Sequence, residues 1–214
     1  MYILVLGGTQ FVGRAIVEQL VPNNHVTLFN RGSDIEEVEN GNRNHAIFPN
    51  LSRIFGDRNN IEDIKQLRNY KWDLVIDLEF SSTNVINMVD NLLDIVPIYT
   101  FISTGALNDA VHCEDKQDSQ DTVWPDGTTY ETACKYIDEK KKSEEYIMKT
   151  YQKWLIFRPY YLCGEFDYSN RFDYTNFPEL YFKETNTKVE NYEIVNNFAA
   201  RVRLNIERGE FGFK

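Results

Sequence analysis

The sequence has few cysteines and no long apolar run. Its three cysteines, Cys113, Cys134 and Cys163, are widely spaced and form no C-x-x-C pair. This spacing is typical of free thiols in a reducing compartment and offers no framework for a metal. No apolar run approaches membrane-spanning length, and no charged segment precedes an apolar core as in a signal peptide. We therefore expect a cytoplasmic protein without a metal site.

The sequence also lacks an excess of basic residues. Its 23 basic and 33 acidic side chains give a formal net charge of −10, which argues against nucleic acid or an anionic membrane as the main partner. Any bound phosphate must then be held by local geometry. With 214 residues, of which 42% are hydrophobic, the chain suits one domain or one domain with a small appendage.

The first thirteen residues predict a strand, a glycine turn and a helix. Residues 2–6 are an unbroken apolar run, Gly7 and Gly8 permit a sharp turn, and Gly13 opens a pattern of period 3.6. Such a turn presents free N–H groups and the positive end of a helix dipole to a phosphate. A structural turn in another α/β fold is the alternative interpretation. The candidate cofactor-binding residues of this turn are Gly7, Thr9, Gln10, Phe11, Val12 and Gly13.

The end of the second predicted strand, residues 25–29, indicates which cofactor is bound. Units specific for NAD usually carry an acidic residue here, to hydrogen-bond the ribose 2′-hydroxyl. This chain has Asn30 and Arg31 instead. The uncharged Asn30 does not repel a 2′-phosphate as an acidic residue would, and Arg31 supplies a cation that can bind it. We therefore expect NADP(H) to be favoured over NAD(H). A purely solvated role for Arg31 in a loop is the alternative.

Strands and helices alternate along most of the chain. This order predicts an α/β, Rossmann-type, doubly wound parallel sheet with right-handed crossovers. The polar residues 34–50 predict a loop or a short helix, and the acidic stretch 108–127 predicts a loop that is either a lid or disordered. Strands are predicted at residues 2–6, 25–29, 53–55, 72–77, 98–102 and 154–157. Helices are predicted from residue 13, at 61–67 and 85–95, from 128 or 132 to 151, and at 192–208.

One pair of residues on the long predicted helix has the chemistry of an acid/base site. Tyr136 and Lys140 are four residues apart and so share a helix face, where an ammonium favours the phenolate. The spacing alone is weak evidence, but the pair follows the strand that ends in Ser103 and Thr104, whose hydroxyl groups suit a substrate oxygen. Tyr130 is a weaker candidate, because the first lysine after it lies further round the helix.

Six motifs, taken in order, resemble those of one enzyme family. They are ILVLGGTQFVG, VTLFNRG, GDR, FISTG, the Tyr136–Lys140 pair and LIFRP. The chain is similar to extended or atypical short-chain dehydrogenases/reductases, and more closely to their NAD(P)-dependent epimerase/dehydratase branch. The resemblance covers residues 1–165 and implies an NAD(P)-binding Rossmann domain there. Residues 166–214 would then be a much reduced C-terminal substrate lobe packed on that domain.

The resemblance implies roles for individual residues. Tyr136 would be the catalytic acid/base, Lys140 would lower its pKa and bond the nicotinamide ribose, and Thr104 would take the place of the usual serine or threonine. The substrate would be a nucleotide sugar or a small carbonyl or hydroxyl compound, and the reaction an oxidoreduction, epimerisation or dehydration. Further implied cofactor contacts are Asp57 and Arg58 beside the adenine, Leu78, and the backbone that follows Pro159.

Two departures from the family pattern leave alternatives open. Gln10 stands where many relatives have the middle glycine, and little chain remains for a substrate lobe. A catalytically silent NADP(H)-binding regulatory module is therefore the alternative function; the acidic balance disfavours a third, RNA binding. The aromatic residues between Tyr160 and Phe182 either stack on a substrate base or, as we favour, cap a sheet edge or form a homodimer contact.

Overall fold

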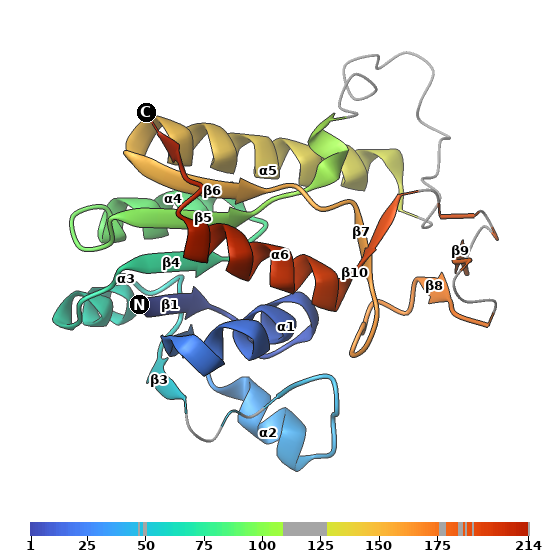
Figure 1. The fold of residues 1–214 in the computed structure, drawn as a ribbon, viewed down its shortest axis with the longest axis horizontal. Helices are drawn as coiled ribbons and strands as arrows, with labels where there is room; N and C mark the ends of the chain where they lie inside the picture. Colours follow the sequence, from blue (N-terminus) through green and yellow to red (C-terminus); the bar gives the residue numbers. More distant parts are fainter. Residues whose placement is uncertain are drawn as a thin grey trace.

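A seven-stranded sheet forms the centre of the molecule, and helices cover both of its faces (Figure 1). The computed structural model describes residues 1–46, 48, 51–108, 128–175, 179–183, 186, 188–189 and 191–213. The strand order is β11-β6-β5-β4-β1-β2-β3, and every neighbouring pair is parallel except β11 with β6. This is the doubly wound order of a Rossmann fold, with its switch point between β1 and β4. The strands are β1 Tyr2–Leu6, β2 His25–Asn30, β3 Ser52–Phe55, β4 Leu74–Asp77, β5 Ile98–Ile102, β6 Lys153–Phe157 and β11 Gly212–Phe213.

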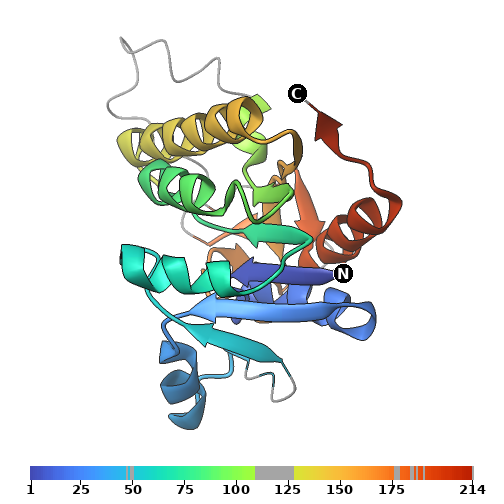
Figure 2. The same ribbon diagram turned by 90° about the vertical axis from the view of Figure 1, so that its left-hand side faces the viewer.

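The helices form two layers, which Figure 2 shows on opposite sides of the sheet. Helices α1 and α6 pack together on one face, while α3, α4 and α5 cover the other. Two short 3-10 turns, at Val21–Asn23 and Gln66–Asn69, follow α1 and α3. The α-helices are α1 Phe11–Leu20, α2 Ser33–Glu39, α3 Ile61–Lys65, α4 Ser82–Leu92, α5 Tyr130–Thr150 and α6 Val195–Arg208. No helix in the described ranges is long and apolar enough to cross a lipid bilayer.

The core consists of two apolar layers, one on each face of the sheet. In β1, Ile3 and Val5 pack toward α1 and α6, whereas Leu4 and Leu6 pack on the opposite face. Successive strand residues point to opposite faces, so a strand buried on both sides must be apolar throughout. This explains the unbroken apolar run at residues 2–6.

A small lobe follows β6 at the carboxyl end of the sheet. Strand β7 (Tyr161–Cys163) pairs in parallel with β10 (Tyr192–Ile194), and β8 (Phe172–Asp173) pairs with β9 (Tyr181–Phe182) in antiparallel fashion. The lobe has its own cluster of buried side chains, formed by Cys163, Phe172, Leu180, Phe182 and Val189. Helix α6 and strand β11 then return to the main sheet, as Figure 1 shows. The division of the chain at residue 165 stays a prediction.

The structure confirms the predicted fold class and differs from the expected element boundaries in detail. Helix α1 begins at Phe11 rather than Gly13, and a short helix, α2, forms within the polar stretch 34–50. Residues 192–194 form strand β10 rather than helix, because they pair with β7. The predicted loop at residues 108–127 lies outside the described residues apart from Asn108.

Candidate functional site

The turn between β1 and α1 contains three glycines, two of which are closely packed and one of which borders open space. A Cβ on Gly8 would lie 2.9 Å from the Leu28 side chain, and a Cβ on Gly13 only 2.8 Å from the Cα of Gly8. These two positions therefore require glycine for close packing. Gly7 has a φ of +103°, and a Cβ there would meet no atom of the described chain within 4 Å. Open space therefore lies above Gly7, where the sequence predicts a phosphate cradle.

A segment after α2 forms one wall of this cradle. The N–H of Ala46 donates to the main-chain oxygen of Thr9 at 2.8 Å, and His45 pairs with Gln10 in an isolated antiparallel bridge. The Nδ1 atom of His45 is buried and has no hydrogen-bond partner in the described part of the chain. Sequence reasoning missed His45, because no local pattern indicates that it meets the turn.

A cleft of about 890 Å³ opens at the carboxyl ends of the strands and includes the cradle. It brings together eleven of the predicted site residues: Gly7, Thr9, Gln10, Phe11, Val12, Gly13, Leu78, Thr104, Tyr136, Lys140 and Pro159. Four others, Asn30, Arg31, Asp57 and Arg58, do not line it. Its walls also include Tyr160, Tyr161 and Tyr168, which belong to the aromatic group noted in the sequence, and three residues that the sequence did not single out: His45, Phe80 and Arg171.

Thr104 and Tyr136 meet in this cleft. The Thr104 hydroxyl lies close enough to Tyr136 to lower the pKa of the tyrosine, and the Thr104 hydroxyl oxygen accepts the N–H of Ala106 at 3.3 Å. Helix α5 positions Tyr136; Thr129 caps its first turn by accepting the N–H of Thr132. Tyr130, the weaker candidate, is not among the described residues that line the cleft. The structure thus places the preferred tyrosine beside the predicted hydroxyl group.

Lys140 lies beneath this pair and is almost completely buried. Its Nζ atom donates to the main-chain oxygen of Ile102 at 2.6 Å and to that of Glu79 at 2.8 Å. The same atom lies 5.9 Å from the centre of the Tyr136 ring. Burial lowers the pKa of Lys140 to about 8, although the nearby carboxylates of Asp77, Glu79 and Glu144 oppose the shift.

The pKa of Tyr136 is determined mainly by burial. Burial raises it above its usual value, and this effect outweighs the Thr104 hydroxyl and the positive charge of Arg171, which both lower it. The Lys140 ammonium group donates to the two carbonyl oxygens. The expected lowering of the tyrosine pKa by the lysine stays a prediction.

Arg58 takes part in a buried charge network instead of standing at an open edge. Its guanidinium group donates to Glu79 at 2.7 Å and to Asp77 at 3.0 Å. Asp77 also accepts the Tyr99 hydroxyl at 2.6 Å. These two carboxylates raise the pKa of Arg58 despite the opposing effect of burial. Its guanidinium hydrogen bonds are thus directed to the protein, which leaves the expected contact with adenine a prediction.

Asn30, Arg31 and Asp57 form the outer end of the predicted cofactor site, beyond the cleft. The Asn30 side-chain oxygen accepts from Arg53 at 3.1 Å, while its Nδ2 atom is buried without a partner in the described ranges. Arg31 is exposed. The N–H of Asn59 is the main cause that holds the pKa of Asp57 below its usual value, and the charge of Arg31 contributes. Arg31 therefore lies near Asp57, and the roles of both in binding a cofactor stay predictions.

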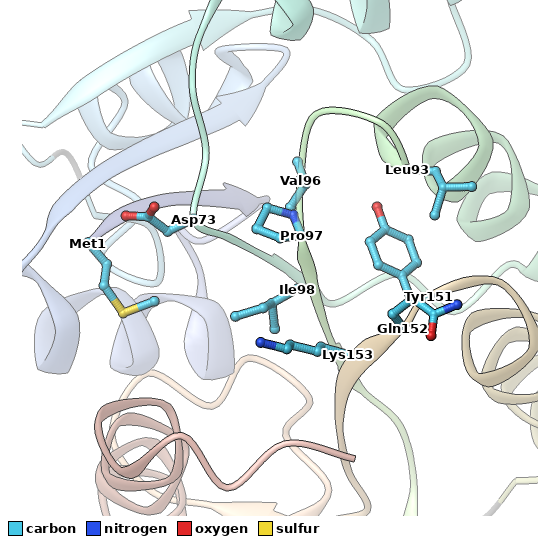
Figure 3. A pocket seen from close by; sticks show the side chains of 9 residues that line it. All are labelled: Met1, Asp73, Leu93, Val96, Pro97, Ile98, Tyr151, Gln152 and Lys153. Atoms are coloured by element: carbon cyan, nitrogen blue, oxygen red, sulfur yellow. The ribbon is translucent and has the colours of Figure 1, made fainter. Parts of the chain in front are cut away.

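A second hollow, of about 630 Å³, lies at the opposite end of the sheet (Figure 3). Figure 3 shows Met1 and Asp73 on one side of Pro97, with Leu93 and Tyr151 on the other. The carboxylate of Asp73 accepts the N–H of Tyr2 at 2.7 Å. Ligands of open α/β sheets bind at the carboxyl ends of the strands, so we assign the functional site to the larger cleft.

Comparisons with known proteins agree on the fold. No family model matches the sequence, and no curated protein matches it. A short-chain dehydrogenase/reductase from Veillonella parvula in complex with NADP is 13% identical, with a TM-score of 0.63 over 96% of this chain and 87% of that chain. A UDP-N-acetylglucosamine 4-epimerase from Methanobrevibacter ruminantium in complex with UDP-N-acetylmuramic acid is 16% identical, with a TM-score of 0.60 over 96% and 73%. A putative NAD-dependent epimerase/dehydratase from Bacillus halodurans is 13% identical, with a TM-score of 0.60 over 98% and 89%.

At these identities the likeness concerns the fold, which agrees with the family resemblance of the motifs. The chain has the Rossmann-type fold of short-chain dehydrogenases/reductases and NAD-dependent epimerases/dehydratases.

Proposed function

We propose that the protein is an NADP(H)-dependent oxidoreductase or epimerase/dehydratase that acts on a nucleotide sugar or a small carbonyl or hydroxyl compound. One observation carries the proposal: the hydroxyl groups of Thr104 and Tyr136 share a cleft with the glycine turn and Lys140. A proton donor thus lies in the same cavity as a phosphate cradle. The fold neighbour from Veillonella parvula, which was solved with NADP, supports the choice of cofactor.

The residues present fit a dinucleotide. The open space above Gly7 and the first N–H groups of α1 suit the pyrophosphate. The amide nitrogen of Asn30, which has no partner among the described residues, and the exposed Arg31 suit a 2′-phosphate. Lys140, at the base of the cleft, would hold the nicotinamide ribose. When bound, the nicotinamide supplies or accepts the hydride.

The chain itself supplies a positioned proton. In the reductive direction, the Tyr136 hydroxyl gives its proton to the carbonyl oxygen of the substrate, which becomes a hydroxyl group. In the oxidative direction, the phenolate takes that proton back. Because the Thr104 oxygen already accepts the N–H of Ala106, its own proton is free to point at Tyr136 or at the substrate oxygen. The raised pKa of Tyr136 keeps it protonated and ready as an acid at neutral pH.

One observation favours the alternative, a catalytically silent NADP(H)-binding module. The Lys140 ammonium donates to two main-chain oxygens. A module that binds the cofactor for regulation needs the cradle but no activated tyrosine. In that case Lys140 serves to join α5 to the sheet.

Turnover measurements on matched variants distinguish the two functions. NADPH oxidation is followed with a panel of sugar nucleotides and small carbonyl compounds, for the wild type, Tyr136→Phe and Tyr146→Phe. Tyr146 lies on the same helix but hydrogen-bonds Asp90 on the outer surface. For an enzyme, Tyr136→Phe lowers kcat by about 10²- to 10⁴-fold and Tyr146→Phe leaves it unchanged. NADPH binding without turnover of any compound supports the silent module.

A further inference from the structure

Arg58 connects the segment after β3 to the end of β4. In the sheet these two strands are separated by β1 and β2. The guanidinium group donates to the carboxylate of Glu79 at 2.7 Å and to that of Asp77 at 3.0 Å. The side chains of Arg58 and Glu79 are largely buried, and that of Asp77 is completely buried. Loss of the arginine would therefore leave two carboxylates without their cation inside the protein.

The two carboxylates also hold the turn that follows β4. The Asp77 carboxylate accepts the N–H of Glu79 at 3.0 Å, with the same oxygen that Arg58 contacts. The Glu79 carboxylate contacts Arg58 with one oxygen. With the other it accepts the N–H groups of Phe80 and Ser81, at 2.9 and 3.0 Å. Arg58 therefore restrains the main chain of this turn as well as its side chains.

The main chain of the same turn holds Lys140. The Nζ atom of Lys140 donates to the main-chain oxygen of Glu79 at 2.8 Å, and its other printed partner is the oxygen of Ile102 at 2.6 Å. Glu79 thus contacts Arg58 with its carboxylate and Lys140 with its main chain. A displacement of Arg58 reaches the Lys140 ammonium through this single residue.

The charges of the network act on Lys140 as well. Burial lowers the pKa of Lys140 to about 8, and the positive charge of Arg58 contributes to this lowering. The carboxylates of Asp77 and Glu79, at the end of β4, act in the opposite direction, as does Glu144 from the helix of Lys140 itself. Removal of the arginine charge should therefore raise the pKa of the lysine.

We propose that Arg58 is a positioning residue, which acts through Glu79 to hold Lys140 where the lysine binds the nicotinamide ribose. This role rests on the proposed function for what Lys140 binds, and it replaces the expected contact of Arg58 with adenine. The two roles concern opposite halves of the cofactor. A positioning residue affects the nicotinamide half, whereas an adenine contact affects the other half.

The adenine half of the cofactor, used alone, distinguishes the two roles. Dissociation constants are measured by calorimetry for NADPH and for adenosine 2′,5′-bisphosphate. Arg58→Met should weaken NADPH binding about tenfold or more and leave bisphosphate binding unchanged, as Lys140→Met should. Arg31→Ala is the contrasting variant and should weaken both ligands, because both carry the 2′-phosphate. If Arg58→Met weakens both ligands or neither, the proposal is overturned.

An NMR titration tests the action of Arg58 on Lys140 without any cofactor. In protein labelled with ¹³C at the lysine Cε atoms, the signal missing from Lys140→Met identifies Lys140, and its chemical shift follows protonation. The wild type should titrate near 8, and Arg58→Met should move this pKa toward the ordinary value of 10.5. A purely structural role would lower stability and leave the pKa in place. Equal Lys140 pKa values in the two proteins overturn the proposal.

Two further variants complete the test. Arg58→Gln, whose amide can still donate to one carboxylate, replaces Arg58→Met if the methionine variant does not fold, and it should give the same two results. Arg68→Met removes an arginine that pairs with Asp94 on the surface, and it should change neither the NADPH affinity nor the Lys140 pKa. If the wild type binds no NADPH, the proposed function fails, while the NMR titration still decides whether Arg58 acts on Lys140.

Discussion

Lys140 donates a hydrogen bond of 2.6 Å to the main-chain oxygen of Ile102, the last residue of β5. A second bond, of 2.8 Å, reaches the oxygen of Glu79 beyond the end of β4. One side chain thus joins α5 to the ends of two neighbouring strands. Because α5 carries Tyr136 and β5 leads into Thr104, this connection holds the two cleft hydroxyl groups in register. Lys140 is therefore a structural element of the site as well as its buried cation.

Removing the Lys140 ammonium should destabilise the fold. Lys140→Met leaves two carbonyl oxygens without their partner, and each unsatisfied buried group costs about 1–3 kcal/mol. Chemical denaturation followed by circular dichroism should show the loss in the free energy of unfolding. Lys141→Met, at an exposed position on the same helix, is the control and should change it by less than about 0.5 kcal/mol. Equal stabilities of the two variants would contradict the structural role.

The buried ammonium should also make stability depend on pH. The pKa of Lys140 is about 8 in the fold against 10.5 ordinarily, so between these values the unfolded chain binds more protons than the native one. Stability contributed by this group must then rise with pH across that window. The difference in unfolding free energy between the wild type and Lys140→Met should widen from pH 8 to pH 10. A constant difference over this range would show that Lys140 is not buried as a cation.

The pH dependence of turnover should respond to Thr104. Burial raises the pKa of Tyr136 while the Thr104 hydroxyl lowers it, so Thr104→Val should raise this pKa further. Oxidation of a hydroxyl substrate requires the phenolate, and its rate should therefore increase with pH and reach its plateau at a higher pH in the variant. Profiles of kcat/KM against pH measure the shift, and Thr104→Ser should restore the wild-type profile. A Thr104→Val profile that matches the wild type excludes the proposed contact.

Alanine variants at two glycines with similar backbone conformations distinguish the effect of backbone strain from the loss of cofactor binding. Gly7 has a φ of +103° and Gly41 a φ of +90°, and a Cβ on either would meet no described atom within 4 Å. Alanine at either position should cost about 1–3 kcal/mol through backbone strain. Gly7→Ala should in addition abolish NADPH binding, because its methyl group fills the cradle, whereas Gly41→Ala should retain it. Fluorescence titration of NADPH checks both, and intact binding in Gly7→Ala would place the cofactor elsewhere.

The choice of cofactor should depend on Arg31. Arg31→Ala should reduce the preference for NADPH over NADH by about tenfold or more, since a charge-assisted contact with the 2′-phosphate is lost. Arg68→Ala removes an exposed arginine that pairs with Asp94 on another part of the surface, and the ratio should not change. Dissociation constants for both cofactors give the ratio. If the ratio of the two dissociation constants is the same in Arg31→Ala as in the wild type, Arg31 is only a solvated cation of the loop.

The aromatic residues after β6 divide between the two roles that the sequence left open. Phe172 and Phe182 are buried in the cluster of the small lobe. Tyr160, Tyr161 and Tyr168 line the cleft, where a substrate would meet them. Composition cannot separate these groups, because both consist of aromatic residues in irregular backbone. The pairing of β7 with β10, far apart in sequence, decides which rings face the cleft.

The charged residues of α5 also form contacts that cannot be predicted from the sequence. Helix spacing predicts that Lys140 pairs with Glu144. In the structure Glu144 instead accepts from Arg158 at 2.5 Å, and Lys140 is drawn to the carbonyl oxygens of the sheet. Spacing identifies which side chains share a helix face, but it does not include groups that the fold places beneath that face.

The sequence by itself determined the features that depend on neighbouring residues. These include the apolar strand run, the glycine turn, and the helix face shared by Tyr136 and Lys140, because burial periodicity and backbone sterics act over a few positions. The ion pairs and pKa shifts of the site depend on the tertiary structure. The network of Arg58 with Asp77, the raised pKa of Tyr136 and the approach of Arg171 to it all join residues distant in sequence. Burial and charge proximity depend on what packs nearby, and packing is settled only when the sheet and the small lobe have formed.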